Sequence, residues 1–262
     1  MIYFLSDAHI GSRAMADRSA HQQQVVHVLQ TLATDADEVW LLGDIFDFWY
    51  EYLWPDRSKD EYQPVLDQLR AMTDRGIAVH FIIGNHDLWT FGALARRTGI
   101  TVHRTPQQLT RCGKRLFLAH GDGLVPDGYL DTFPPEIQRK IRRFMRLRRV
   151  FHNPLLQFLF RLLPPAWGNR FGYGWARQSR LKELAHPCGY KGEQQEELVL
   201  WAKQHPGCDY YIFGHRHIEL DLELADRSRV LILGDMFCQW TYARLTDDGR
   251  LEMLSAADEL SD

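Results

Sequence analysis

The stretch "FIIGNHDLW", residues 81–89, decides how this chain folds. An apolar run stops at Gly84 and is followed at once by an amide, an imidazole and a carboxylate, in Asn85, His86 and Asp87. A short apolar run that ends at a turn residue is typical of a buried strand. One such junction can be an ordinary strand followed by a polar turn. The stretch gains its meaning because the same pattern recurs along the chain.

Short β-type runs alternate with helical stretches, which indicates an α/β fold. The runs are "IYFL" (2–5), "EVWLL" (38–42), "AVHFII" (78–83), "RLFLAH" (115–120), "DYYIF" (209–213) and "RVLIL" (229–233). Residues 19–36 and 62–76 carry apolar residues three or four apart. This spacing predicts two amphipathic helices, the second of which ends at Gly76.

Five of these runs end in side chains of the types that can bind metal ions. The seven candidate ligands are Asp7, His9, Asp44, Asn85, His120, His215 and His217. Because the carboxyl ends of strands in open α/β sheets border one crevice, we expect these side chains to converge. Gly43, Gly84 and Gly214 would allow tight turns or a close approach of backbone there.

The number and the mixture of these carboxylate, amide and imidazole donors indicate how many metal ions the site would hold. Seven ligands are too many for one tetrahedral zinc ion, but they suit two ions that share a bridging carboxylate. A single Asp or His after a strand is more simply a turn former or a helix cap. The fivefold repetition favours a metal site over that simpler explanation.

Composition narrows the class of protein. The 262 residues suffice for one large domain, and the net charge of −3 gives no general attraction to nucleic acid or to anionic lipid. The four cysteines form no CxxC pair and the chain opens on "MIYFLSDAH", so we expect a cytoplasmic protein. The longest apolar segment, residues 153–167, contains Arg161 and prolines, which argues against a membrane-spanning helix.

The long connection between "HGD" (120–122) and "GHRH" (214–217) is unlike an ordinary strand-to-helix connector. Residues 136–150, "EIQRKIRRFMRLRRV", predict a basic amphipathic helix, and residues 154–167, "PLLQFLFRLLPPAW", are nearly all apolar. Such a pair suits an anionic amphiphile or a membrane surface. The alternative is a helical hairpin that packs its apolar side on the main domain and exposes a solvated basic face.

Five motifs, taken together and in this order, resemble the calcineurin-like metallophosphoesterases. They are "DAH" (7–9), "GDIFD" (43–47), "GNHD" (84–87), "HGD" (120–122) and "GHRH" (214–217). The resemblance implies a single α/β domain over residues 1–262, a β-sandwich of two mixed sheets flanked by helices. It also implies that Asp7, His9 and His217 hold one ion, that Asn85, His120 and His215 hold the other, and that Asp44 bridges the two.

The same resemblance assigns supporting roles. His86, beside Asn85, would stabilise or protonate the departing oxygen of a phosphate ester, with Asp87 orienting its imidazole. Asp47 and Asp122 are interpreted as partners of ligands or as turn caps. Asp235, at the end of the sixth run, matches no ligand position and is interpreted as a turn residue.

The insertion sharpens the resemblance. "HGDGLVPDGY" (120–129), "FHNPLLQFLF" (151–160) and "WARQSRLKE" (175–183) are similar to the UDP-2,3-diacylglucosamine hydrolases of lipid A synthesis. That family implies a manganese enzyme, with iron or zinc as alternatives, which lies peripherally on the cytoplasmic face of the inner membrane. It splits the pyrophosphate of a lipid-linked UDP-sugar into UMP and the acylated sugar 1-phosphate. No nucleic acid or protein partner is expected.

Residues 124–180 would then form a helical lid that receives the acyl chains through Leu155, Phe158 and Leu162. The candidate substrate-binding residues are Asn85, His86, Asp127, Arg177, Ser179, Lys182 and His215. Many members of the family have Arg where this chain has His86. Arg177 and Lys182 are chosen for their charge and their closeness to Ser179.

Three other functions stay open at this stage. A metal-dependent nuclease would use the basic helix against phosphates, although the net acidity and the apolar neighbouring helix argue against it. A phosphodiesterase or pyrophosphatase acting on soluble nucleotides would not need an apolar lid. A non-catalytic scaffold would commonly lose ligands, whereas all seven positions are filled here.

Overall fold

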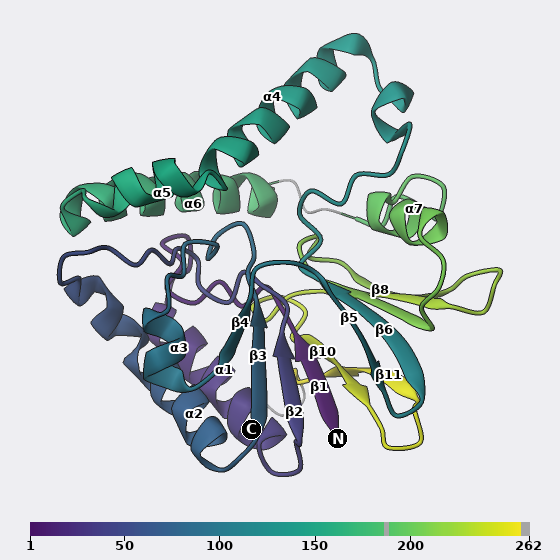
Figure 1. Ribbon diagram of the computed structural model, residues 1–262, viewed down its shortest axis with the longest axis horizontal. Helices are drawn as coiled ribbons and strands as arrows, with labels where there is room; N and C mark the ends of the chain where they lie inside the picture. Colours follow the sequence, from purple (N-terminus) through teal and green to yellow (C-terminus); the bar gives the residue numbers. More distant parts are fainter. Residues whose placement is uncertain (186–188, 258–262) are drawn as a thin grey trace.

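The computed structural model describes residues 1–185 and 189–257, with the side chains of residues 179 and 182–185 left out. Two β-sheets pack face to face, and helices cover their outer faces (Figure 1). This arrangement is the predicted α/β sandwich of two mixed sheets. The predicted strands at residues 2–5, 38–42, 78–83, 115–120, 209–213 and 229–233 and the two predicted helices are confirmed.

The first sheet has six strands in the order β11-β10-β1-β2-β3-β4. The strands are β1 (Ile2–Leu5), β2 (Glu38–Leu41), β3 (Ala78–Ile82), β4 (Thr101–His103), β10 (Thr241–Leu245) and β11 (Leu251–Ser255). β1, β2, β3 and β4 are parallel to one another, whereas β10 is antiparallel to both β1 and β11. The carboxyl ends of β1, β2 and β3 therefore lie along one edge of the sheet.

The second sheet has five strands in the order β5-β6-β7-β9-β8. They are β5 (Gln107–Arg111), β6 (Lys114–Ala119), β7 (Tyr210–Phe213), β8 (Glu219–Glu223) and β9 (Arg229–Leu233). β6, β7 and β9 are parallel, and the two outer strands are antiparallel to their neighbours. The carboxyl ends of β6 and β7 thus lie side by side.

The apolar pattern did not predict five strands, namely β4, β5, β8, β10 and β11. Four of them, all except β10, are edge strands. An edge strand exposes much of its surface and carries more polar residues, as in "QQLTR" of β5 and "ELDLE" of β8. The apolar signal is correspondingly weak in these segments.

Three apolar clusters hold the layers together. The cluster between the two sheets includes Phe4, Leu42 and Ile212, which are fully buried. A larger cluster joins the first sheet to α1 (Arg18–Leu32) and α2 (Gln63–Asp74), and a third joins the second sheet to α7 (Glu197–Gln204). Each buried side chain of this size contributes roughly 1.5–3 kcal/mol. The strand ends are thus fixed to a rigid scaffold.

Shorter helices complete the main domain. They are η1 (Arg57–Tyr62), α3 (Ala93–Thr98) and η2 (Tyr129–Thr132). No helix in residues 1–185 or 189–257 combines the length and the apolar character needed to cross a bilayer.

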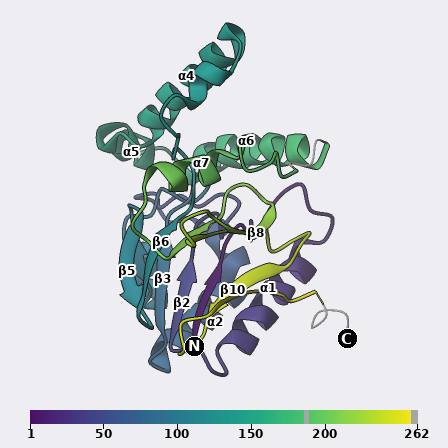
Figure 2. The ribbon, with the colours of Figure 1, turned by 90° about the vertical axis from the view of Figure 1, so that its right-hand side faces the viewer.

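Three helices form the insertion between β6 and β7. They are α4 (Pro135–Phe151), α5 (Pro154–Arg161) and α6 (Pro165–Ala185), and together we call them the helical insertion. Both views show them at the end of the molecule opposite the N-terminus, beyond the carboxyl end of β1 (Figures 1 and 2). α4 has no buried residue and projects away from the sheets.

α6 packs closely on the main domain through small residues. A Cβ atom added at Gly172 would lie 2.2 Å from the ring of Phe48, and one at Gly168 would lie 2.2 Å from the hydroxyl oxygen of Tyr52. Neither position can take a larger side chain without a shift of the helix. These glycines therefore set how closely α6 approaches the loop after β2.

Candidate metal centre

The ends of five strands bring the predicted ligands together. Asp7 and His9 follow β1, Asp44 follows β2 and Asn85 follows β3. His120 follows β6, and His215 and His217 follow β7. We call Asp7, His9, Asp44, Asn85, His120, His215 and His217 the seven-residue cluster. Four of its members are almost fully buried: Asp7 and His9 are 0% exposed, and Asp44 and His120 are 2% exposed.

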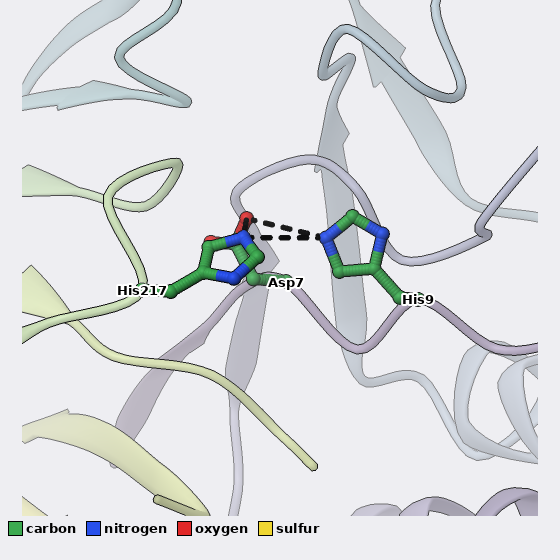
Figure 3. A group of neighbouring side chains, drawn as sticks. All are labelled: Asp7, His9 and His217. Atoms are coloured by element: carbon green, nitrogen blue, oxygen red, sulfur yellow. Dashed lines mark hydrogen bonds and ion pairs between the residues drawn. The ribbon is translucent and has the colours of Figure 1, made fainter. Parts of the chain in front are cut away.

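One half of the cluster contains Asp7, His9 and His217, whose ligand atoms all lie within 4.8 Å of one another. Figure 3 shows the two imidazoles and the carboxylate turned toward a common point. His217 Nε2 is 3.1 Å from Asp7 Oδ1 and 3.4 Å from His9 Nε2. Two imidazole nitrogens and a carboxylate oxygen at these separations suit one divalent cation.

Asp44 joins this half to the other. Its Oδ2 is 3.7 Å from His9 Nε2 and 3.4 Å from His120 Nε2, so one oxygen faces both sides. Its Oδ1 accepts a hydrogen bond from the backbone N–H of His86 at 2.8 Å, which fixes the carboxylate. This geometry suits the bridging role expected of Asp44.

Asn85 and His215 complete the second half. Asn85 Oδ1 lies 3.2 Å from His120 Nε2, and the ring centroids of His120 and His215 are 5.0 Å apart. The backbone N–H of His215 also donates to Asp7 Oδ2 at 2.8 Å. The structure thus brings together all seven of the residues that the sequence predicted as ligands.

The backbone is strained at this cluster. Eight described residues other than glycine have a positive φ, and five of these belong to the cluster. They are Asp7 (53°), His9 (44°), Asp44 (53°), His215 (69°) and His217 (48°). Each costs on the order of 1–3 kcal/mol, and such strain gathers at functional sites where the surrounding structure holds it.

Glycines allow the loops to approach one another. A Cβ atom at Gly84 would lie 2.1 Å from Asp44 Oδ1, and one at Gly214 would lie 2.5 Å from Asp7 Oδ2. Gly43 has a φ of +86°. The close backbone approach predicted for these three glycines is confirmed.

The electrostatics of the cluster favour positive charge. Burial alone would raise the pKa of Asp7, but the nearby imidazoles, His217 above all, hold this pKa well below its ordinary value. Burial alone would lower the pKa of His120, but the Asp44 carboxylate raises it well above its ordinary value. His215 differs, since burial and the nearby charge of His120 lower its pKa to about 4.

The unsatisfied atoms of the cluster fit a bound cation. Within the described residues, no donor has hydrogen-bond geometry to the buried Asp7 Oδ1, although His217 Nε2 is only 3.1 Å away. A buried carboxylate oxygen without a partner is costly unless a metal ion or another cation lies beside it. The donor set and this oxygen together fit divalent metal ions.

His86 lies against the cluster but has its own geometry. Its Nδ1 is 2.7 Å from the carbonyl oxygen of Asp47, and its Nε2 is 4.0 Å from Asp44 Oδ2. Burial lowers its pKa. His86, His9 and Asp44 also form a group whose ligand atoms lie within 4.8 Å of one another. The imidazole can therefore face a phosphate or serve as a further ligand.

Asp87 has a different role from the one expected. Its carboxylate accepts hydrogen bonds from four backbone N–H groups, those of Gly84, Asp44, Ile45 and Phe46. The His86 imidazole is oriented by the Asp47 carbonyl and not by Asp87. Burial and the charge of Asp44 raise the pKa of Asp87 to about 7. Asp87 thus ties the loop after β2 to the loop after β3.

Two residues that support the cluster come from distant parts of the chain. Asp47 Oδ1 lies 3.5 Å from His9 Nδ1, as expected for a partner of a ligand. Arg180, on α6, is 1% exposed, and its Nη1 lies 3.1 Å from His217 Nδ1. Arg180 is a buried neighbour of the cluster that was not predicted from the sequence. The sequence signal that could have indicated its burial is the spacing of four residues between Gly168, Gly172, Ala176 and Arg180. This spacing places them on one face of a helix, and all four are buried.

The other predicted substrate-binding residues, Asp127, Arg177, Ser179 and Lys182, lie outside the cluster or outside the described side chains. Asp127 is exposed, and its backbone bonds to the side chain of Gln204 on α7. Arg177 is exposed on α6. The side chains of Ser179 and Lys182 lie outside the described residues. Asp127 and Arg177 show no hydrogen bond or ion pair with the seven-residue cluster among the residues that the structure describes.

An apolar cavity of about 390 Å³ adjoins the cluster. Its lining from the main domain is Phe48, Tyr50 and Trp89, and its lining from the helical insertion includes Leu156, Leu159, Phe160, Leu163, Phe171 and Trp175. The Trp175 ring lies 5.2 Å from the His86 ring, which connects the cavity to the cluster. Leu155, Phe158 and Leu162, which we expected to contact the acyl chains, are 66%, 50% and 46% exposed and do not line this cavity. Helical periodicity does not by itself tell which apolar stripe faces inward.

Known proteins resemble this chain over most of its length. The family described as calcineurin-like phosphoesterase matches residues 1–219. A protein from Porphyromonas gingivalis named UDP-2,3-diacylglucosamine hydrolase is 33% identical, over 99% of this chain and 98% of its own length. Proteins of the same name from Edwardsiella ictaluri (30% identical, 82% and 74% covered) and Aeromonas salmonicida (29% identical, 90% and 86% covered) also match. The chain belongs to the calcineurin-like phosphoesterase family.

Proposed function

We propose that this protein hydrolyses UDP-2,3-diacylglucosamine at its pyrophosphate. Water adds across one phosphorus–oxygen bond, and the products are UMP and 2,3-diacylglucosamine 1-phosphate. The observation that carries this proposal is the apolar cavity, whose lining residue Trp175 has its ring 5.2 Å from that of His86, beside the seven-residue cluster. A soluble nucleotide would have no use for such a cavity. The name of the relatives, UDP-2,3-diacylglucosamine hydrolase, supports the same substrate.

The seven-residue cluster would hold two cations. Asp7, His9 and His217 would hold one, Asn85, His120 and His215 would hold the other, and Asp44 would contribute to both. Two bound cations lower the pKa of a water molecule and neutralise phosphate oxygens. The chain itself contributes rigidity, because strained, buried loops hold the donors in place before substrate arrives.

His86 would contact the phosphate group of the substrate. The carbonyl oxygen of Asp47 lies 2.7 Å from Nδ1 and orients the ring. Nε2 lies 4.0 Å from Asp44 Oδ2. The negatively charged pyrophosphate beside the ring would favour the protonated imidazole. In that form His86 stabilises negative charge or gives a proton to the departing oxygen.

The helical insertion would act as a lid for the acyl chains, with the apolar cavity as their site. Its volume of about 390 Å³ lies in the range usual for ligand pockets. Each methylene group that moves from water into such a cavity contributes roughly 0.8 kcal/mol. Acylated substrate should therefore bind far better than the bare UDP-sugar. Asp127, Arg177, Ser179 and Lys182 remain candidates for contacts with the sugar and the nucleotide.

Manganese is the cation we propose, with iron and zinc as alternatives. The oxygen donors of Asp7, Asp44 and Asn85 suit manganese, and the imidazoles accept all three metals. Metal analysis of the purified protein, followed by chelation and reloading with each ion in turn, identifies the cation that restores hydrolysis.

We also propose that the protein lies peripherally on the cytoplasmic face of the inner membrane. α4 carries several exposed arginines together with the exposed apolar residues Phe144, Leu147 and Val150. The outer side of α5 adds Leu155 and Phe158. Basic and apolar groups on one surface favour binding to anionic lipid.

The test compares two substrates with the manganese-loaded protein. UMP release from UDP-2,3-diacylglucosamine is expected to exceed release from UDP-N-acetylglucosamine by at least two orders of magnitude in kcat/KM, since only the first fills the cavity. Equal turnover of the two substrates would overturn the lipid assignment. Absence of UMP release from both, with metal bound, would overturn the pyrophosphatase assignment.

A further inference from the structure

The loop after β7 carries a predicted ligand on either side of Arg216. His215 belongs to one half of the seven-residue cluster and His217 to the other. Both ligands have a positive φ, of 69° and 48°, which residues other than glycine rarely adopt. A backbone in this conformation persists only where surrounding contacts hold it. The contacts of Arg216, between the two ligands, therefore bear on both halves of the cluster.

The Arg216 side chain forms a two-bond ion pair with Glu196. Its Nε donates to Glu196 Oε1 at 2.7 Å, and its Nη2 donates to Oε2 at 3.3 Å. The Glu196 side chain is 0% exposed and that of Arg216 is 11% exposed, so water and salt screen the pair little. Paired hydrogen bonds between a guanidinium and a carboxylate fix direction as well as distance. The pair thus holds the Arg216 side chain in one orientation.

Glu196 anchors this pair to a rigid part of the fold. It is the residue immediately before α7. α7 packs on the second sheet through Leu198, Val199 and Ala202, which are at most 1% exposed. The second sheet also contains β7, whose carboxyl end carries the loop. The loop is therefore fixed at its middle to a packed helix, in addition to its attachment to β7.

The backbone of Arg216 is bonded locally. Its N–H donates to the carbonyl oxygen of Gly214, two residues earlier, at 2.8 Å. Such a bond shapes the loop but does not attach it to another element. The side-chain pair with Glu196 supplies an attachment to a segment that lies 20 residues away in the sequence.

The pair brings no net charge to the metal centre. A buried charge is costly unless an opposite charge accompanies it, so Arg216 and Glu196 each depend on the other. Because the carboxylate balances the guanidinium, the loop is held without an uncompensated positive charge near the cation positions. The pair can thus fix the ligands without repelling the ions.

We propose that Arg216 is a positioning residue for the metal centre. With Glu196 it holds the loop after β7 so that His215 and His217 each face a cation position. The cations themselves rest on the proposed function, in which the seven-residue cluster binds two of them. Groups that orient metal ligands are typically worth about 10–100-fold in metal affinity. Both ions should depend on this pair, because the loop supplies one ligand to each.

The test measures Mn²⁺ binding to the metal-free protein by isothermal titration, without substrate. In the wild type we expect two ions per chain. In Arg216→Met we expect both ions to bind about 10–100-fold more weakly. Removal of a positive charge would by itself favour cation binding, so a weaker affinity reports the lost position of the ligands. Unchanged or tighter binding of both ions in this variant overturns the proposal.

Arg111→Met is the matched control. Arg111 Nε donates to Glu38 Oε2 at 2.8 Å and Nη2 donates to Oε1 at 3.3 Å, which nearly repeats the geometry of the Arg216 pair. Glu38 begins β2 and Arg111 ends β5, at the opposite ends of the sheets from the cluster. This variant should keep the wild-type Kd for Mn²⁺, even if its melting temperature falls. Equal losses of Mn²⁺ affinity in the two variants would show that Arg216 acts through general stability, and would overturn the proposal.

Arg216→Lys tests the same point without a change in charge. Lysine keeps a positive charge beside Glu196, but a single ammonium group cannot reproduce the two bonds of a guanidinium. Weaker Mn²⁺ binding than in the wild type supports the proposal, and a wild-type Kd overturns it. This variant also serves if Arg216→Met fails to fold, which circular dichroism will show.

The two proposals can fail separately, because the titration involves no hydrolysis. A wild type that binds two Mn²⁺ ions but releases no UMP would overturn the substrate assignment alone. A wild type that releases UMP, together with an Arg216→Met variant of unchanged Mn²⁺ affinity, would overturn the role of Arg216 alone. A wild type that binds no Mn²⁺ would overturn the manganese centre and the role of Arg216 with it.

Discussion

The seven-residue cluster and the helical insertion are built on opposite principles. The cluster is buried, its backbone has a positive φ at five of its seven residues, and Asp87 ties two of the loops together with four hydrogen bonds. The insertion is open, with no buried residue on α4 and exposed Leu155, Phe158 and Trp167 on the helices that follow. Fixed geometry suits the chemistry, which is common to a whole family. Exposed apolar surface suits recognition of one particular substrate.

The contrast between the two regions indicates that catalysis depends on the cluster and substrate recognition on the insertion. A change in the cluster should affect every substrate alike, because all of them need the cations. A change in the insertion should affect acylated substrate and lipid surfaces alone. Arg180 is the exception that joins the two regions, and the predictions below test how well the separation holds.

Replacing Asp44 should have the largest effect. Asp44→Ala removes the carboxylate that faces both His9 and His120, so both cations should bind more weakly. We expect kcat/KM to fall more than 100-fold for every substrate, since even the partners of ligands are worth about 10–100-fold. Metal content measured by plasma mass spectrometry should fall together with turnover. Retention of two ions per chain would contradict the bridging role.

Replacing His86 should separate chemistry from metal binding. His86→Ala is expected to lower kcat by roughly 10²-fold or more, for acylated and soluble substrates alike, because it removes a group that handles charge and protons at the phosphate. Metal content should stay at the wild-type level. If metal is lost as it is in Asp44→Ala, His86 is instead a ligand of the group that it forms with His9 and Asp44.

Neutralising α4 should weaken membrane binding and leave chemistry intact. Arg142, Arg143 and Arg146 are exposed, and replacing all three with Gln should reduce binding to vesicles of anionic phosphatidylglycerol by about 3 kcal/mol, or about 100-fold. Sedimentation with vesicles measures this, and raised salt should produce the same loss in the wild type. Turnover of a soluble diester should not change. Arg148→Gln is the control, because Arg148 is engaged with Asp122 and should matter less for vesicles.

Two phenylalanines on α5 provide a matched test of the role of the cavity, and their replacement should have the smallest effect. Phe160 lines the cavity, whereas Phe158 is 50% exposed and does not. Phe160→Ala should lower kcat/KM for UDP-2,3-diacylglucosamine about ten-fold, mainly through KM, and should leave a soluble diester unaffected. Phe158→Ala should spare both activities and weaken vesicle binding only. Equal losses in the two variants would show that the cavity does not receive the acyl chains.

Much of the fold could be predicted from the sequence, because buried strands carry continuous apolar runs. The edge strands β4, β5, β8 and β11 could not, since their exposed faces are polar. The convergence of the seven side chains could be predicted because each follows a strand, and strand ends meet at one edge of a sheet. The role of Asp87 could not, since its four donors come from two separate loops.

The helical insertion shows the same division. Its existence and its basic and apolar character are visible in residues 136–167. Which face of α5 lines a cavity depends on how the helix docks, and for that reason Phe160 and not Phe158 points inward. Arg180 looks like one more surface charge on a helix until the packing of Gly168 and Gly172 brings it beside His217.

The sequence by itself determined the order of elements, the donor atoms and the family, because these follow from local runs of residues and from motifs at strand ends. The packing of the chain decided which donors lie close together, which apolar side chains enclose a cavity, and that Arg180 lies beside His217. The physical reason is that the first set depends on neighbours along the chain. The second depends on distances of a few ångströms between segments that are far apart in sequence.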